Sequence, residues 1–206
     1  MQETKVGRYD STKDIVFAPE HTLLETEHFR ISADDHPITE GHLLIIPKEN
    51  LSCVGEFSPE LMEEFTTLYD QSRNFVKDMY GSVSTFEHGK VGQTIYHAHV
   101  HVLPFDGTLE QIVPEGEKVM KAVRGISDVV DAFRKDGQYL FISVGDQARL
   151  VDTSLGYPRF FRDRFASALG KREAGDWQKS KNNIAAKLQS EAAIRNLERK
   201  WLSSTR

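Results

Sequence analysis

Three histidines at every second position are the residues of this 206-residue sequence best suited to chemistry. They are His97, His99 and His101, and small apolar residues separate and follow them: Ala98, Val100 and Val102. Successive side chains of a β-strand point to opposite faces, so one face would carry three imidazoles while the other packs into a core. Burying titratable rings costs free energy unless they are hydrogen-bonded, so the pattern indicates a functional site.

Two kinds of chemistry fit this arrangement. Neutral imidazole is a good nucleophile near pH 7, so His99 could attack phosphorus while its neighbours orient it and stabilise charge. Alternatively, His97 and His99 could bind a metal ion, although three histidines of one straight strand cannot easily share it. No histidine follows His101 to complete such a ligand set. We therefore expect no metal ligand among these residues.

The sequence around the histidines resembles the histidine triad (HIT) family of nucleotide hydrolases and transferases. The three histidines are followed by Val-Leu-Pro and preceded by Gly-Gln-Thr at residues 92–94. A second block, residues 34–48, has an acidic residue before a proline-containing turn, then Gly-His, an apolar strand and Pro-Lys. The two blocks stand in the order and at the separation typical of that family, and the resemblance covers residues 15–105.

The resemblance implies roles for the three central residues. His99 would be the nucleophile that forms a transient nucleotidyl-histidine, and His97 and His101 would contact the phosphate or the leaving group. Transferase branches of the family tend to carry Gln at the third position, so His101 resembles the hydrolase branches.

The resemblance also implies substrate-binding residues around the triad. His42 would line the site from the neighbouring strand, and Asp34 would hold the ribose hydroxyls, since a carboxylate accepts two hydrogen bonds. Gln93 and Thr94 would lie near the phosphate.

The sequence departs from the family pattern in two places. Glu87 and His88 stand where many members have an amide near the phosphate, and we expect one of them to replace it. Cys53 is the only cysteine, so a structural zinc site built on two cysteines cannot exist here.

Composition indicates a globular protein, with 39% hydrophobic and 28% charged residues. No run of about twenty apolar residues and no apolar signal region occur, so we expect a cytoplasmic protein without a membrane partner. Residues 1–158 contain 14 basic and 26 acidic residues, a balance of −12, whereas residues 159–206 contain 12 and 5, a balance of +7. The simplest explanation is a basic C-terminal segment packed on its own acidic body; a nucleic-acid partner is the weaker one.

The first half of the chain predicts a helix on an antiparallel sheet, which is the α+β class. Short strands are expected at residues 15–18, 22–27, 29–33, 42–47, 84–87 and 94–103, with the histidine strand central. Ser58, Pro59 and Glu60 begin a helix that Gly81 ends.

Beyond Pro104 the resemblance fades, and we expect a HIT-like domain at residues 1–108 with a mixed, mainly helical extension at residues 109–206. Helical spacing is present at 119–133, with Gly125 as a possible break. Residues 139–151 predict a hairpin and residues 158–169 a helix. The last thirty residues are helix-prone, but their apolar residues do not follow one stripe, which indicates a break, two packing partners or a frayed end. No internal repeat is visible. We expect the extension to wrap the triad domain and border the substrate cleft.

These observations predict a HIT-type hydrolase that releases a nucleoside monophosphate from a dinucleoside polyphosphate or a nucleoside phosphoramidate. No cofactor would be required, although Mg²⁺ could accompany a polyphosphate, and the resemblance favours a homodimer. Two alternatives stay open: a metal-dependent hydrolase that uses His97 and His99, and a nucleotide-binding regulator without turnover.

Overall fold

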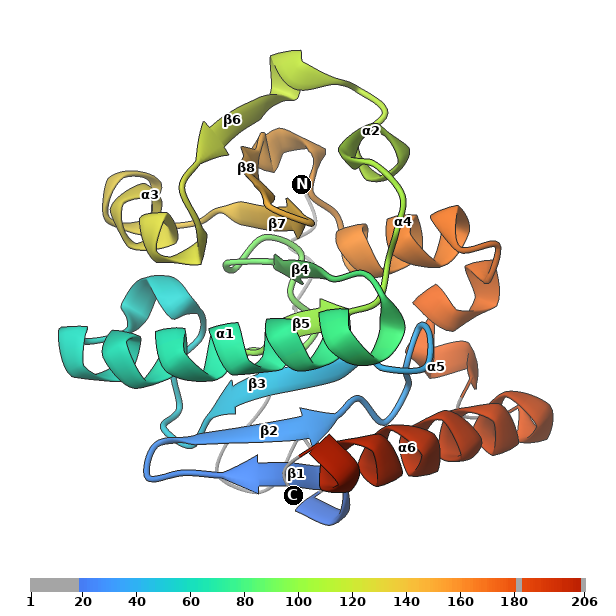
Figure 1. The fold of residues 1–206 in the computed structure, drawn as a ribbon. Coiled ribbons are helices and arrows are strands. Elements are labelled where there is room, and N and C mark those ends of the chain that lie inside the picture. Colours follow the sequence, from blue (N-terminus) through green and yellow to red (C-terminus); the bar gives the residue numbers. More distant parts are fainter. Residues whose placement is uncertain (1–18, 181–182, 205–206) are drawn as a thin grey trace, which may run out of the picture.

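The structure, a computed structural model, describes residues 19–180 and 183–204, so the strand expected at residues 15–18 lies outside the described residues. Eight strands form one antiparallel sheet in the order β1-β2-β3-β5-β4-β7-β8-β6 (Figure 1). Helices cover its faces, which confirms the α+β class. The strand that carries His101, β5, lies in the interior of the sheet, as predicted.

The strands are β1 (Thr22–Glu25), β2 (Phe29–Ala33), β3 (Leu43–Pro47), β4 (Ser84–Glu87), β5 (Val100–Leu103), β6 (Met120–Val123), β7 (Leu140–Val144) and β8 (Gln147–Val151). The α-helices are α1 (Pro59–Tyr80), α2 (Leu109–Ile112), α3 (Val129–Asp136), α4 (Phe160–Ala168), α5 (Trp177–Ser180) and α6 (Ile184–Ser204). None of the described helices is both long and apolar enough to span a membrane.

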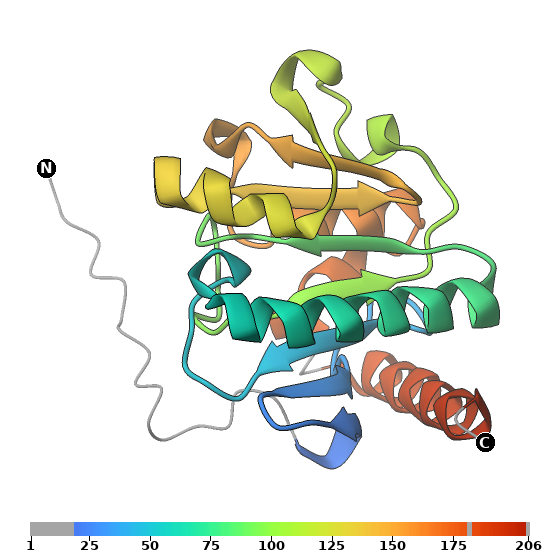
Figure 2. The same ribbon diagram turned by 60° about the vertical axis from the view of Figure 1, so that its left-hand side comes forward.

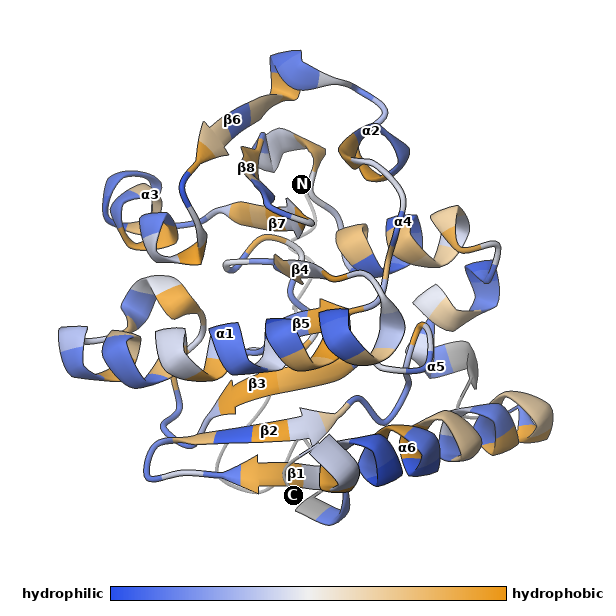
Figure 3. Ribbon diagram, in the orientation of Figure 1, coloured by the Kyte–Doolittle hydropathy of each residue, from blue (hydrophilic) through white to orange (hydrophobic). Residues whose placement is uncertain are grey.

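The sheet separates two hydrophobic cores. α1 and α3 pack on one face, and α4 packs on the other (Figure 2). The apolar residues between and after the histidines all belong to the core under α1, as their alternation predicts: Ala98, Val100 and Val102. β3 is buried at all five positions because both of its faces are covered, and it is apolar along its length (Figure 3).

The longest helix of the first half begins and ends where its capping residues predict. The Ser58 side chain accepts a hydrogen bond from the backbone N–H of Leu61 at 3.2 Å, and Pro59 occupies the first turn. Gly81 ends the helix with a φ of 83°, a left-handed conformation that glycine adopts without strain.

The histidine strand is shorter than predicted. β5 begins only at Val100, so His97 and His99 lie in the irregular segment that precedes it. The register between β3 and β5 would place Pro47 opposite Ala98, and proline has no N–H to continue the ladder. Ala98 instead donates its backbone N–H to the Leu51 carbonyl at 2.7 Å. This interruption lets His97 and His99 approach the rim of the sheet.

The extension differs from its sequence-based description in one element. Residues 120–123 were expected to be helical but form the edge strand β6, because they pair with β8. In the C-terminal helix α6, Ile194, Leu197 and Trp201 are buried, whereas Ile184 and Leu188 are 79% and 59% exposed. Only the second half of α6 therefore packs on the body. The hairpin β7–β8 and the helix α4 are confirmed.

The extension repeats a topology of the first half, although the sequence shows no repeat. β3-α1-β4-β5 and β6-α3-β7-β8 follow the same order along the chain. The sheet order is mirrored about the β4–β7 pair, and α1 and α3 lie on the same face (Figure 2). The second unit carries no histidine. Its pairing with β4 makes that strand interior to one continuous sheet.

Candidate functional site

His99 is held in one tautomer by a backbone contact. Its Nδ1 lies 2.7 Å from the carbonyl oxygen of His97, which can only accept a hydrogen bond. Nδ1 therefore carries the proton of the neutral ring, and Nε2 keeps its lone pair. The ring is only partly buried, so the structure presents a nitrogen suited to nucleophilic attack.

His97 is tied to the end of the neighbouring strand. Its Nε2 donates to the carbonyl oxygen of Pro47 at 2.7 Å, and its ring is partly buried. This contact fixes the segment that supplies the carbonyl for His99. His97 thus lies at the rim of the site beside His99.

His42 and His101 form a buried hydrogen-bonded chain that begins at the backbone. The Ile38 N–H donates to Nδ1 of His42 at 3.1 Å, so the proton of a neutral His42 is on Nε2. That Nε2 lies 2.9 Å from Nδ1 of His101, which then accepts and leaves its own proton on Nε2. The His101 ring centroid is 4.9 Å from that of His99. The arrangement places an N–H donor ring next to a ring whose Nε2 keeps its lone pair.

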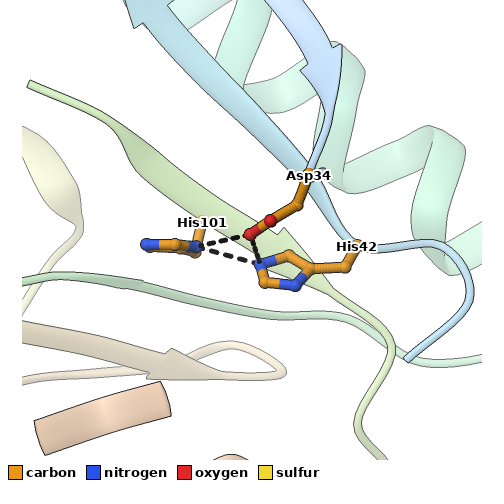
Figure 4. A group of neighbouring side chains, drawn as sticks. All are labelled: Asp34, His42 and His101. Atoms are coloured by element: carbon orange, nitrogen blue, oxygen red, sulfur yellow. Dashed lines mark hydrogen bonds and ion pairs between the residues drawn. The ribbon is translucent and has the colours of Figure 1, made fainter. Parts of the chain in front are cut away.

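Asp34 joins this chain from the end of β2 (Figure 4). Its Oδ2 lies 3.5 Å from Nε2 of His42 and 3.7 Å from Nδ1 of His101. Its Oδ1 accepts from the His36 N–H at 2.8 Å, and its Oδ2 accepts from Nη1 of Arg162 at 2.7 Å. Both oxygens therefore have protein partners, and a ribose contact of the kind expected from the resemblance would share these oxygens with them.

The electrostatics of the cluster favour neutral imidazoles beside an ionised carboxylate. Burial lowers the pKa of His99 and of His42 to about 4, and it lowers the pKa of His101 well below its usual value. Burial alone would raise the pKa of Asp34, but the Arg162 cation and His42 outweigh it and hold that pKa well below the usual range. The positive charge of Arg162 also contributes to the lowered pKa of each histidine.

Asp34, His42 and His101 are the residues whose geometry comes nearest to a metal site. Their potential ligand atoms lie within 4.8 Å of one another. However, these atoms face each other through hydrogen bonds, and the Arg162 cation already compensates the carboxylate. The cluster therefore fits a hydrogen-bonded network better than a divalent cation. His97 and His99, the ligands of the metal alternative, direct ring nitrogens at backbone carbonyls.

Aromatic side chains from α4 and β4 enclose the buried side of the site. Phe86 stacks on His101 with ring centroids 4.2 Å apart, and Phe161 stacks on His88 at 5.6 Å. The Phe161 N–H donates to Nε2 of His88 at 3.2 Å, and burial lowers the pKa of His88 to about 3. His88 thus anchors the extension over the site, and its Nε2 is not available to a phosphate.

Glu87 lies on the opposite face of the sheet from the histidines. Phe86 pairs directly with His101, so the next residue along β4 must point to the α1 side. There Glu87 accepts from the Val54 N–H at 2.9 Å and from the Tyr139 hydroxyl at 2.5 Å. The expectation that Glu87 replaces an amide near the phosphate does not match this placement.

The buried Glu87 makes stability depend on pH. Burial raises its pKa from 4.5 to about 7, so the folded protein binds this proton more tightly than the unfolded chain does. The contribution of Glu87 to the free energy of unfolding should fall by about 3 kcal/mol as pH rises from about 4.5 to about 7. We expect the stability of Glu87→Gln relative to the native protein to increase over that interval. Urea unfolding of both proteins at pH 5 and pH 8 measures this, and a pH-independent difference would contradict it.

Gln93 and Thr94 precede the histidine segment. The Gln93 side chain is buried and donates to the Ser52 carbonyl at 2.7 Å, and its Oε1 has no hydrogen-bond partner among the described residues. Thr94 is exposed. The structure therefore gives Gln93 a role in holding the loop and leaves Thr94 at the surface before the triad.

Arg162 is the residue of this cluster that sequence reasoning missed. It comes from α4, far along the chain from the two blocks, and it is only 7% exposed. It was one of the 12 basic residues of the C-terminal segment, with no motif around it. The charge imbalance between the body and this segment is the one sequence signal that pointed toward such a contact.

Residues 17–108 match the family model of the HIT domain. This is the region that the two sequence blocks indicated, and the match ends where the extension begins.

Curated relatives match the same part of the chain. The protein named Protein hit of Bacillus subtilis is 29% identical over 90 residues, which are 42% of this chain and 62% of that protein. An uncharacterized HIT-like protein of Helicobacter pylori is 29% identical over 86 residues, 41% of this chain and 83% of that protein. The chain therefore spans less than two thirds of the length of the Bacillus protein.

Solved structures also align with this region. A hypothetical histidine triad nucleotide-binding protein from Sulfolobus tokodaii has a TM-score of 0.39 and 26% identity, and the alignment covers 43% of this chain and 62% of that one. A HIT family member from Bacillus subtilis has a TM-score of 0.39 and 22% identity, covering 56% and 86%.

Proposed function

We propose that this chain is a nucleotide hydrolase that releases a nucleoside monophosphate from a dinucleoside polyphosphate or a nucleoside phosphoramidate. The observation that carries the proposal is the pair of opposite tautomers in adjacent rings. His99 has a lone pair on Nε2, and His101 has a proton on Nε2. The HIT domain at residues 17–108 supports the choice of a nucleotide as substrate.

The proposed reaction has two steps. Nε2 of His99 attacks the α-phosphorus, so that a P–N bond forms while the bond to the leaving group breaks. The leaving group departs with that electron pair and takes up a proton, which His101 is placed to give. Water then attacks the phosphorus of the nucleotidyl-histidine and returns a proton to Nε2 of His101. The P–N bond breaks, His99 regains its lone pair, and the nucleoside monophosphate leaves.

Several finer features belong to the same proposal. No metal is needed to generate the nucleophile, and Mg²⁺ would serve only to accompany a polyphosphate. The homodimer and the cytoplasmic location stay predictions. If two chains joined their sheets edge to edge, the contact would have to be made by the edge strands β1 or β6, because β4 is already paired with β7.

The test is AMP release by the full chain, with a dinucleoside polyphosphate and adenosine phosphoramidate assayed separately, each with excess chelator and with added Mg²⁺ or Zn²⁺. We expect release from at least one substrate in chelator, because a neutral imidazole supplies the nucleophile. Release only with added metal would support the metal-dependent alternative. Tight AMP binding without any release would support the regulator and overturn the proposal.

A further inference from the structure

Arg162 reaches from the extension into the histidine cluster. Its Nη1 donates to Oδ2 of Asp34 at 2.7 Å, and its Nη2 donates to the His36 carbonyl at 2.5 Å. A longer contact of 3.5 Å joins Nη2 to the Ala174 carbonyl. The guanidinium fork therefore joins α4, the β2–β3 loop and the end of β2 in one buried place.

We propose that Arg162 is a positioning residue of the histidine site, which acts through Asp34 to keep His42 and His101 in their neutral, hydrogen-bonded arrangement. This inference rests on the proposed hydrolase function. It assigns to the extension a part in the chemistry, in addition to its part in the fold.

The argument begins with the charge of Asp34. This carboxylate lies 3.5 Å from His42 and 3.7 Å from His101, and all three side chains are buried. A buried carboxylate without a cation would be compensated by a proton on a neighbouring imidazole. Arg162 supplies the positive charge instead, so neither imidazole has to carry it.

A proton in the wrong place would break the chain of tautomers. Nδ1 of His101 must accept from Nε2–H of His42, whose Nδ1 in turn accepts from the Ile38 N–H. Protonated His101 would direct a second N–H at that of His42, and protonated His42 would direct an N–H at Ile38. Either state would replace an attractive contact by two opposed donors and move the His101 ring.

The charged and titratable groups that surround the cluster come from four parts of the fold. Asp34 and His42 flank the β2–β3 loop, His88 follows β4, and Arg162 lies on α4. His99 and His101 come from the histidine segment. The charge of Arg162 lowers the pKa of His42, His88, His99 and His101, although burial is the larger cause in every case.

Arginine suits this position better than lysine would. The planar fork bridges the Asp34 carboxylate and the His36 carbonyl with separate N–H groups. A lysine would retain the charge but could not hold both acceptors in the same geometry.

The test compares Arg162→Met with Arg164→Met. Arg164 is on the same helix and pairs with Glu115 at 2.7 Å, so it controls for loss of a partly buried ion pair on α4. We expect Arg162→Met to lower kcat by about 10²-fold with little change in the affinity for AMP, as for a misplaced catalytic group. The acid limb of the pH–rate profile of Arg162→Met should move upward from near pH 4. The kcat of Arg162→Lys should fall between those of the native protein and Arg162→Met. Arg164→Met should keep the native kcat and profile.

A second readout does not depend on turnover. NMR titration of the imidazole nitrogens should show the pKa of His42 or His101 raised in Arg162→Met, with the exposed His28 unchanged as an internal reference. If the native protein releases no AMP but this shift occurs, the hydrolase proposal fails and the positioning role stands. Native kcat together with native histidine titrations in Arg162→Met would overturn the role.

The variant Asp34→Asn/Arg162→Met covers the case in which Arg162→Met does not fold. It removes both charges of the pair and leaves no uncompensated ion. If Arg162 acts by compensating the charge of Asp34, the double variant should fold and keep kcat within about 10-fold of the native value, because neither imidazole then has to carry a proton. A folded double variant that is slowed by about 10²-fold would show that Arg162 does not act through the charge of Asp34, and it would overturn the proposal.

Discussion

Replacement of His99 by glycine should lower the rate of nucleotide release by about 10³-fold or more, and free imidazole should restore part of it. The lone pair on Nε2 is the attacking group of the proposed mechanism. The contact between Nδ1 and the His97 carbonyl fixes the tautomer in which Nε2 carries that lone pair. The partly buried ring makes no large contribution to either core, so the variant should fold.

The measurement is single-turnover AMP release at pH 7 by the native protein, His99→Gly, and His99→Gly with imidazole. His28→Gly, a change at an exposed histidine whose side chain pairs with Glu64 and Glu27, is the control and should keep the native rate. When the native protein is denatured during turnover, it should carry a covalently bound nucleotidyl group that His99→Gly lacks. A His99→Gly variant that turns over at the native rate would remove the histidine nucleophile from consideration.

A chain that ends at residue 108 should lose cooperative unfolding. The extension covers one face of the sheet with Phe160, Phe161 and Phe165, which pack on Phe86 and on other residues of the first half. It also pairs β7 with β4 along four residues. Truncation would expose this second core and open a strand edge, and truncation of one buried Phe alone typically costs about 3–5 kcal/mol.

Thermal and urea unfolding followed by circular dichroism tests this expectation. Addition of residues 109–206 as a separate chain should restore the transition, because the lost contacts are between the two segments. Leu188→Ala in the full chain, at an exposed position of α6, should leave the transition unchanged. A cooperative transition of residues 1–108 alone would show that the division at residue 108 separates two independent units.

Much of the structure of the first half can be predicted from sequence patterns that are only a few residues long. Alternation along residues 97–102 predicts which side chains enter the core under α1, and Ser58, Pro59 and Gly81 predict both ends of α1. The hairpin of the extension and the helix after it are equally local features. Such patterns are reliable because they depend on neighbours in sequence.

The errors share a different cause. Glu87 was expected at the phosphate, but the side it faces depends on the register of β4 against β5, where Phe86 meets His101. Residues 120–123 have helical spacing, yet pairing with β8 makes them a strand. In both cases a partner distant in sequence overrides or decides what the local pattern leaves open.

The sequence by itself determined the resemblance of the first half to the HIT domain, the proximity of His42 to His101 and the α+β class, because these rest on residue types at short, fixed spacing. Only the tertiary structure decided that Asp34 is paired with Arg162, that His88 anchors α4, and that the extension continues the sheet in a mirrored topology. The physical reason is that a buried charge or a strand edge is satisfied by whichever group the folded chain brings to it, and that group has no fixed separation in sequence.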